Sequence, residues 1–170
     1  AGPSWFGRFT TRLDGLFKAS LVRERLASLL GRKHAEYIAK MMEMFERGDL
    51  FEALRHAIPL SDEKAEGGGG LPLPPSPRER LDITFGGGSG RPAVGLDGRI
   101  YDTLRSLYRS AFERLEGEGR IDEAAFVLAE LLRDVPGAVA FLERHGRLKR
   151  AAELAETAKL APEVVIRQWL

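Results

Sequence analysis

The sequence has 170 residues and a mass of 18.8 kDa, the size of one domain or of one compact unit with a linker. Its 26 basic and 25 acidic residues leave a net charge of +1, which argues against electrostatic capture of nucleic acid as the main function. The chain has no cysteine, which excludes disulfides, thiolate nucleophiles and Cys-ligated metal centres. It has no run of 18 apolar residues, so we expect no membrane-spanning segment.

The first 33 residues are basic, with seven basic side chains against two acidic ones. Within residues 4–18, bulky apolar side chains recur at helical spacing, while arginines lie elsewhere on the helical wheel. We expect this face to pack on the following helices, and we keep a membrane interface and a partner helix as alternatives. The aromatic side chains concerned are Trp5, Phe6, Phe9 and Phe17.

Helical spacing continues to Pro59, so we expect residues 1–60 to form an N-terminal helical segment. Ser20 is a suitable cap for a first helix, which ends at Gly31. An apolar stripe then predicts a helix that stops at Gly48, and a short helix follows it. The stripe consists of Tyr37, Ile38, Met41, Met42 and Phe45.

Residues 61–96 have the composition of a connector, with glycine runs at 67–70 and 86–90 and a proline cluster at 72–77. Inside it, residues 81–85 alternate between apolar and polar side chains, the period of a strand. A single short strand cannot form a sheet. This segment therefore lies along the helices, pairs with another chain, or is merely extended.

Residues 97–170 are predicted to be helical, starting with a clear apolar stripe from Ile100 to Leu115 behind Asp97 as the cap. Glycines at 48, 119 and 146 share a local pattern: glycine, a charged residue, Leu or Ile, any residue, Glu or Arg, then alanine. We expect each glycine to end a helix in the left-handed conformation and the alanine to allow close helix packing.

The prolines recur at nearly the same interval, since Gly119 and Gly146 are 27 residues apart and Pro136 and Pro162 are 26 apart. Each unit therefore has the pattern of a helical hairpin, and the predicted fold is all-α. We favour stacked hairpins over an orthogonal bundle and expect them to continue beyond residue 170. The first helix of one unit is expected to bury Ile121, Ala124, Ala125, Leu128, Leu131 and Leu132.

The turns at Gly119 and Gly146, each followed by Arg, an aliphatic residue and two alanines, resemble those of α-solenoid proteins with tetratricopeptide or clathrin-heavy-chain repeats. The resemblance covers residues 97–170, with a weaker counterpart at 46–58. It implies an interaction scaffold, commonly a segment of a larger assembly protein. The period is shorter than the tetratricopeptide repeat, so no peptide-binding residues are carried over.

A search for chemistry yields no catalytic residue, cofactor site or metal site. His34, His56 and His145 lie far apart and lack the spacing that places two ligands on one helix face. We expect His145 to cap a helix C-terminus. Ser89 lies in a glycine run, but Arg91-Pro92 stands where a phosphate-binding loop has Lys-Ser/Thr.

We therefore expect a non-enzymatic, helical scaffold from a longer bacterial-type protein, with protein partners and no bound nucleic acid. The alternative is a peripheral or juxtamembrane module that uses residues 4–18. We expect the protein to be cytoplasmic, with a position at the membrane face as the variant of this location. The C-terminus ends in mid-stripe, so Trp169 and Leu170 are candidate contacts with a partner, a following repeat or a second copy of the chain.

Overall fold

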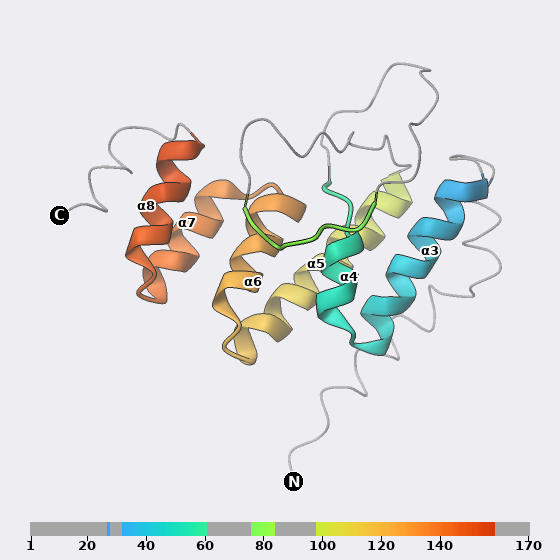
Figure 1. The fold of residues 1–170 in the computed structure, drawn as a ribbon, viewed down its shortest axis with the longest axis horizontal. Coiled ribbons are helices and arrows are strands. Elements are labelled where there is room, and N and C mark those ends of the chain that lie inside the picture. Colours follow the sequence, from blue (N-terminus) through green and yellow to red (C-terminus); the bar gives the residue numbers. More distant parts are fainter. Residues whose placement is uncertain (1–26, 28–31, 61–75, 84–97, 159–170) are drawn as a thin grey trace, which may run out of the picture. The chain divides into compact units, whose positions relative to one another are not determined.

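The computed structural model describes residues 27, 32–60, 76–83 and 98–158, and every regular element in these ranges is helical (Figure 1). The predicted all-α class is confirmed for this part of the chain. The elements are α3 (Arg32–Arg47), α4 (Leu50–His56), α5 (Gly98–Gly117), α6 (Ile121–Phe126), the π-helical turn η1 (Val127–Leu131), α7 (Val135–Arg144) and α8 (Leu148–Thr157).

The chain divides into two compact units, and the division falls within α4. Unit 1 contains Ala1–Ala53 and Gly70–Ser76, and unit 2 contains Leu54–Gly69 and Pro77–Leu170. In unit 1, α3 is amphipathic and buries the stripe predicted from the sequence, with Tyr37 less buried than the rest. Its buried side chains are Ala35, Ile38, Met41, Met42 and Phe45.

The three glycines of the repeated pattern end helices in the left-handed conformation, with φ of 80° at Gly48, 74° at Gly119 and 72° at Gly146. In each turn the glycine N–H donates to the carbonyl three residues before it, and the next N–H donates to the carbonyl five residues before it. The N–H five residues after the glycine then closes the first turn of the next helix. The same hydrogen bonds therefore join α3 to α4, α5 to α6 and α7 to α8.

The start of α7 confirms the predicted place of Pro136, which lies in its first turn. Asp134 caps this helix, because its carboxylate accepts a hydrogen bond from the Gly137 N–H at 2.9 Å. Pro162, the corresponding proline of the next unit, lies outside the described residues.

The helix formed by α6 and η1 is buried on more sides than the sequence predicts. Phe126, Val127 and Ala129 are buried in addition to the expected Ala124, Ala125 and Leu131. The predicted core positions Ile121, Leu128 and Leu132 are partly exposed. Two causes account for the difference. This helix packs against α5 on one side and α7 on another, and the π turn shifts the side chains away from a 3.6-residue period.

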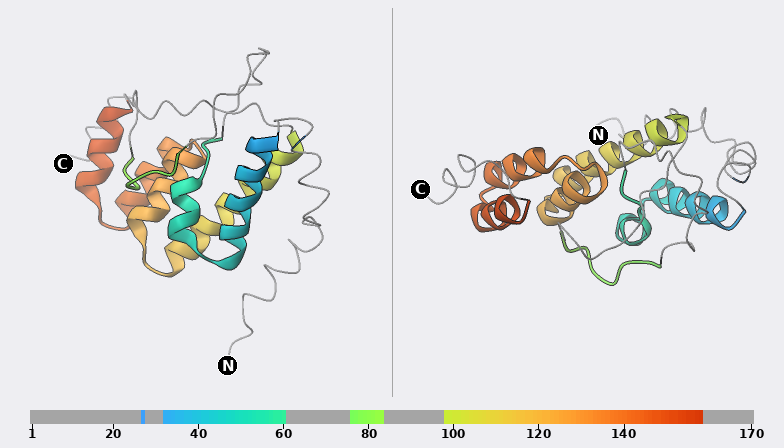
Figure 2. Two further views of the ribbon diagram at one scale, coloured as in Figure 1. Left: turned by 45° about the vertical axis from the view of Figure 1, so that its right-hand side comes forward. Right: turned by 90° about the horizontal axis from the view of Figure 1, so that it is seen from above.

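In unit 2, consecutive helices pack closely from α5 to α8, and alternate helices also meet through their side chains. Phe112 of α5 and Phe141 of α7 make an edge-to-face contact with ring centroids 5.1 Å apart. Arg150 of α8 pairs with Asp122 of α6 at 2.8 Å. Helices α5 and α7 thus lie side by side in one layer, and α6 and α8 lie in the other (Figure 2).

The chain leaves α4 through a buried extended segment, residues 57–60. The Tyr108 hydroxyl accepts a hydrogen bond from the Ile58 N–H at 3.2 Å and donates one to the Ile58 carbonyl at 2.8 Å. The Leu60 N–H donates to the Leu131 carbonyl at the end of η1, at 2.9 Å. These bonds give the buried backbone the partners that it would otherwise lack.

Candidate interaction surface

The surface residues singled out from the sequence lie outside the described residues. They are Trp5, Phe6, Phe9 and Phe17 near the N-terminus and Trp169 and Leu170 at the C-terminus. Membrane contact through residues 4–18 and self-association through the C-terminal helix therefore stay predictions. In the described part of the chain, no helix is long and apolar enough to cross a bilayer.

A second segment without regular secondary structure, residues 77–83, crosses unit 2 from the end of α4 towards α6 with a bend at residues 79–80 (Figure 1), and we call it the strap. It belongs to the predicted connector and includes the first part of the alternating segment 81–85. In the described residues 81–83 the chain forms no strand. The sequence left three possibilities for this segment: that it lies along the helices, pairs with another chain, or is merely extended. Residues 81–83 follow the first, because they lie along the helices.

Arg78 anchors the strap at the C-terminal end of α4. Its N–H donates to the Arg55 carbonyl at 2.9 Å, and the Arg55 Nε donates to the Arg78 carbonyl at 2.6 Å. Its guanidinium donates to the carbonyls of Leu54, at 3.2 Å, and Ala57. A cation at this place is favourable because the last carbonyls of a helix carry partial negative charge.

The Arg78 guanidinium also lies over the Phe126 ring of α6, with Cζ 5.3 Å from the ring centroid. A guanidinium at this distance from an aromatic face gains a cation–π attraction. One arginine thus connects the strap to two elements of unit 2, the end of α4 and α6.

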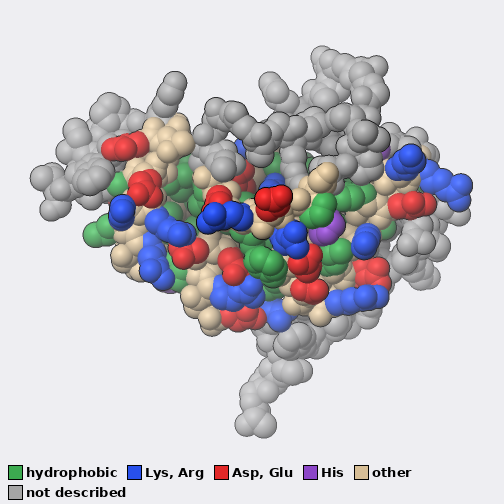
Figure 3. Space-filling view, viewed as in Figure 1, with side chains coloured by type: hydrophobic (Ala, Val, Ile, Leu, Met, Phe, Trp, Pro, Cys, Tyr) green, Lys and Arg blue, Asp and Glu red, His purple; other side chains and the backbone are tan. Residues whose placement is uncertain are grey.

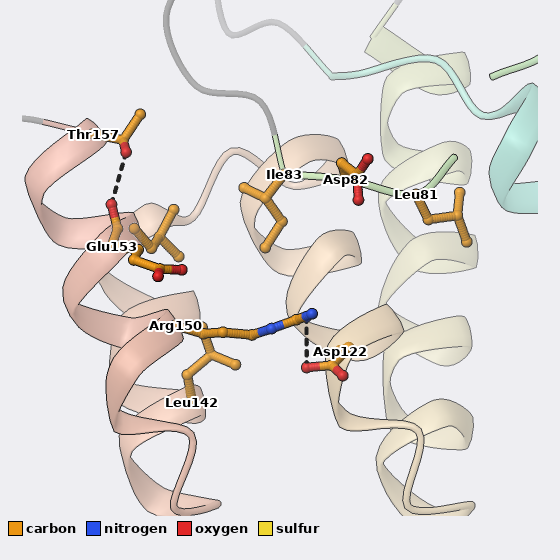
Figure 4. A pocket seen from close by; sticks show the side chains of 9 residues that line it. Leu81, Asp82, Ile83, Asp122, Leu142, Arg150, Glu153 and Thr157 are labelled. Carbon is orange, nitrogen blue, oxygen red and sulfur yellow. Dashed lines mark hydrogen bonds and ion pairs between the residues drawn. The ribbon is translucent and has the colours of Figure 1, made fainter. Parts of the chain in front are cut away.

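Beyond Arg78, the strap borders a groove of about 320 Å³ (Figure 4). Leu142 of α7, Leu154 of α8 and Leu81 and Ile83 of the strap give the groove its apolar lining. The Ile83 side chain points into it. We call this the strap groove. Its remaining lining residues are Asp82, Asp122, Arg150, Glu153 and Thr157.

Charged groups of both signs surround the strap groove. The ion pair of Arg150 and Asp122 crosses it from α8 to α6, and both side chains are about half exposed. Glu153 pairs with Lys149 one turn earlier in α8, at 4.0 Å. Figure 3 shows acidic and basic side chains intermixed over α6 and α8, so the face has apolar contacts within a polar rim.

The ends of α5 and α7 carry a separate polar cluster. The Glu116 Oε1 accepts a hydrogen bond from the Arg144 guanidinium at 3.0 Å and lies 3.4 Å from the His145 Nε2. His145 is the C-cap residue of α7, as the sequence predicts, and its ring packs on Phe141 with centroids 4.5 Å apart. The described residues include no group of acidic and histidine side chains that could hold a metal ion.

No family model, curated protein sequence or solved structure matches the chain.

Sequence reasoning missed Arg78, the residue that fixes the strap. Its partners lie 21 to 24 residues away, so no local spacing points to them. The alternation of Leu81 and Ile83 was the available signal, because side chains two residues apart in an extended chain point to the same side.

Proposed function

We propose that the chain is a non-enzymatic scaffold of stacked helical hairpins that binds an extended segment of a protein partner along the face of α6 and α8. The strap carries this proposal, because an extended segment already lies on that face. A surface that holds one such segment through its backbone and its alternate side chains has the chemistry to hold another.

The packing within unit 2 supports stacked hairpins rather than an orthogonal bundle. Each hairpin contacts the next one along the chain, through Phe112 and Phe141 in one layer and through Asp122 and Arg150 in the other. In such a stack every helix has a neighbour of the same layer, and the exposed edge of a layer forms a continuous surface. This continuous surface would act by holding a partner segment in a fixed register.

The chemistry of the strap groove also supports a peptide ligand. Leu142 and Leu154 offer an apolar surface for a partner side chain, and the ion pair of Arg150 and Asp122 offers polar groups at the edge. Interfaces that bind proteins combine such an apolar centre with a polar rim.

A display library of random peptides tests this proposal. We expect selected peptides to bind the wild-type chain and to lose binding to a Glu153→Arg/Thr157→Arg variant, because both exposed positions line the strap groove. The matched control is Ser106→Arg/Glu113→Arg, which makes the same change of charge at two exposed positions of α5. The control should bind as the wild type does.

Circular dichroism of both double variants checks that the helices are retained. The proposal is wrong if no peptide is selected, or if the two double variants lose binding to the same extent. Equal loss would indicate an electrostatic effect of added positive charge rather than a site on α6 and α8.

A further inference from the structure

We propose that the strap is an intramolecular ligand that exchanges with a partner segment of the pattern Arg-x-x-Φ-x-Φ, where Φ is an aliphatic residue. This inference rests on the proposed function and names the partner class of the same face.

The end of α4 and the Phe126 ring of α6 bind the arginine at the first position of the pattern. The Arg78 guanidinium donates to two carbonyls at the end of α4 and lies over the Phe126 ring. Both bonds come from Nη1, and a lysine at this position would keep the charge, but its ammonium lacks the planar face of a guanidinium that lies over the ring while one nitrogen donates to the carbonyls. The structure therefore assigns arginine, rather than any cation, to the first position.

The strap groove binds the aliphatic side chains at the fourth and sixth positions of the pattern. Leu81 and Ile83 both border it and are partly buried, as the two-residue period of an extended chain requires. The other strap positions are exposed: Glu79 and Arg80 do not line the groove, and Asp82 lies at its edge, where it pairs with the Arg80 Nε at 3.1 Å. The pattern consequently specifies three side chains and leaves the other positions free to vary.

Three observations indicate that the strap can be replaced. In the described part of the chain, every hydrogen bond that ties the strap to the helices involves Arg78. Leu81 and Ile83 leave a volume of about 320 Å³ beside them, so the groove is not filled. In the sequence the strap lies between glycine runs at 67–70 and 86–90, and glycine permits many backbone conformations.

A tethered ligand competes strongly with a free one, because its effective concentration is on the order of millimolar for a short linker. We therefore expect the wild-type chain to bind a free peptide of the strap sequence weakly. Weakening the strap should open the site to that peptide.

The test uses a fluorescent synthetic peptide with the sequence of residues 76–83 and measures its anisotropy with three chains. An Arg78→Ala chain should bind the peptide at least tenfold more tightly than the wild-type chain does. An Arg80→Ala chain should bind it as the wild type does, because Arg80 is exposed and pairs within the strap. A peptide that carries Arg78→Ala should not bind to any of the chains.

Circular dichroism shows whether the Arg78→Ala chain remains folded. A second variant provides the test if it does not. Leu81→Ser/Ile83→Ser weakens the other end of the strap and keeps the anchor at α4. It should also bind the wild-type peptide at least tenfold more tightly than the wild-type chain. Equal binding by wild-type and strap-weakened chains, or no binding by either, overturns the inference.

The result separates this inference from the proposed function. If library peptides bind the α6–α8 face but the strap peptide binds no strap-weakened chain, the scaffold proposal stands and the exchange is wrong. Binding of the strap peptide without any library peptide supports the exchange and contradicts the scaffold proposal. Concentration-dependent dimerisation of the wild-type chain, abolished by Arg78→Ala, would make a second copy the occupant and overturn the assignment to a partner.

Discussion

Tyr108 supplies, from one hydroxyl, both hydrogen bonds of the buried Ile58 backbone. The Arg78 guanidinium donates hydrogen bonds to two carbonyls at the end of α4, those of Leu54 and Ala57. In both cases a side chain from a distant position replaces the backbone partner that a helix would have provided. At the residue scale, each extended segment of unit 2 thus has one side chain that makes two of its hydrogen bonds, and single substitutions test these bonds.

Replacing Tyr108 with Phe removes the hydroxyl and leaves the buried N–H and carbonyl of Ile58 without it. We expect the free energy of unfolding to fall by about 1–3 kcal/mol, the cost of leaving buried polar groups unsatisfied. Urea denaturation followed by circular dichroism measures the change. Thr157→Ala, which removes an exposed hydroxyl, is the control and should change stability by less than about 0.5 kcal/mol. A loss as small as that of the control would show that the Tyr108 hydrogen bonds are not needed.

Glu118, next to the turn at Gly119, predicts a pH dependence. Its hydrogen bond from Arg114, at 2.8 Å, lowers the pKa of the carboxyl below its usual 4.5, and Arg120 adds to this effect. A carboxyl whose pKa is lower in the folded than in the unfolded state stabilises the fold above its usual pKa. That contribution is lost as the pH falls through the folded pKa.

The stability difference between wild type and Glu118→Gln should therefore be positive at neutral pH and should shrink as the pH falls below about 4.5. We expect a small difference, because the Glu118 side chain is 39% exposed and water screens the pair. Thermal unfolding of both chains across this pH range measures it. A difference that is constant with pH, or that grows on acidification, contradicts the assignment.

At the scale of the elements, the hairpin turns depend on glycine for its backbone conformation rather than for space. A side chain at Gly119 would meet nothing within 4 Å, but its φ is positive. Gly119→Ala should therefore lower the free energy of unfolding by about 1 kcal/mol. Gly146→Ala, at the matching position, should do the same.

Gly117 is the matched control, because it is equally open but has no positive φ. Gly117→Ala should leave stability unchanged or raise it by about 0.5 kcal/mol, since alanine favours a helix more than glycine does. Urea denaturation of the three variants makes the comparison. A similar loss in all of them would mean that the cost comes from the side chain and not from the backbone.

The hairpin turns and α6 differ in how far the sequence predicts them. The turns follow from glycine, which is the residue that adopts positive φ most easily, and the local pattern is enough to locate them. The burial of Phe126 and Val127 depends on helices on two sides and on a π turn, neither of which a helical period contains. Patterns within one element are thus readable from the sequence, and contacts between elements are not.

At the scale of the molecule, the all-α class and the extended course of residues 81–83 were both accessible from the sequence. The position of the strap was not, because Arg78 is one of 26 basic residues and its partners lie on other elements. The sequence-based divisions at 1–60, 61–96 and 97–170 and the contacts of Trp169 and Leu170 stay predictions.

Hydrogen exchange with and without a library-selected peptide tests most directly whether the α6–α8 face binds an extended partner segment. The account predicts faster exchange in residues 77–83 when the peptide is bound, because the Arg78 N–H loses its bond to Arg55. Exchange in α6 and α8 should stay the same or slow down. Unchanged exchange in the strap at saturating peptide, with new protection on α5 instead of α6 and α8, would contradict the account.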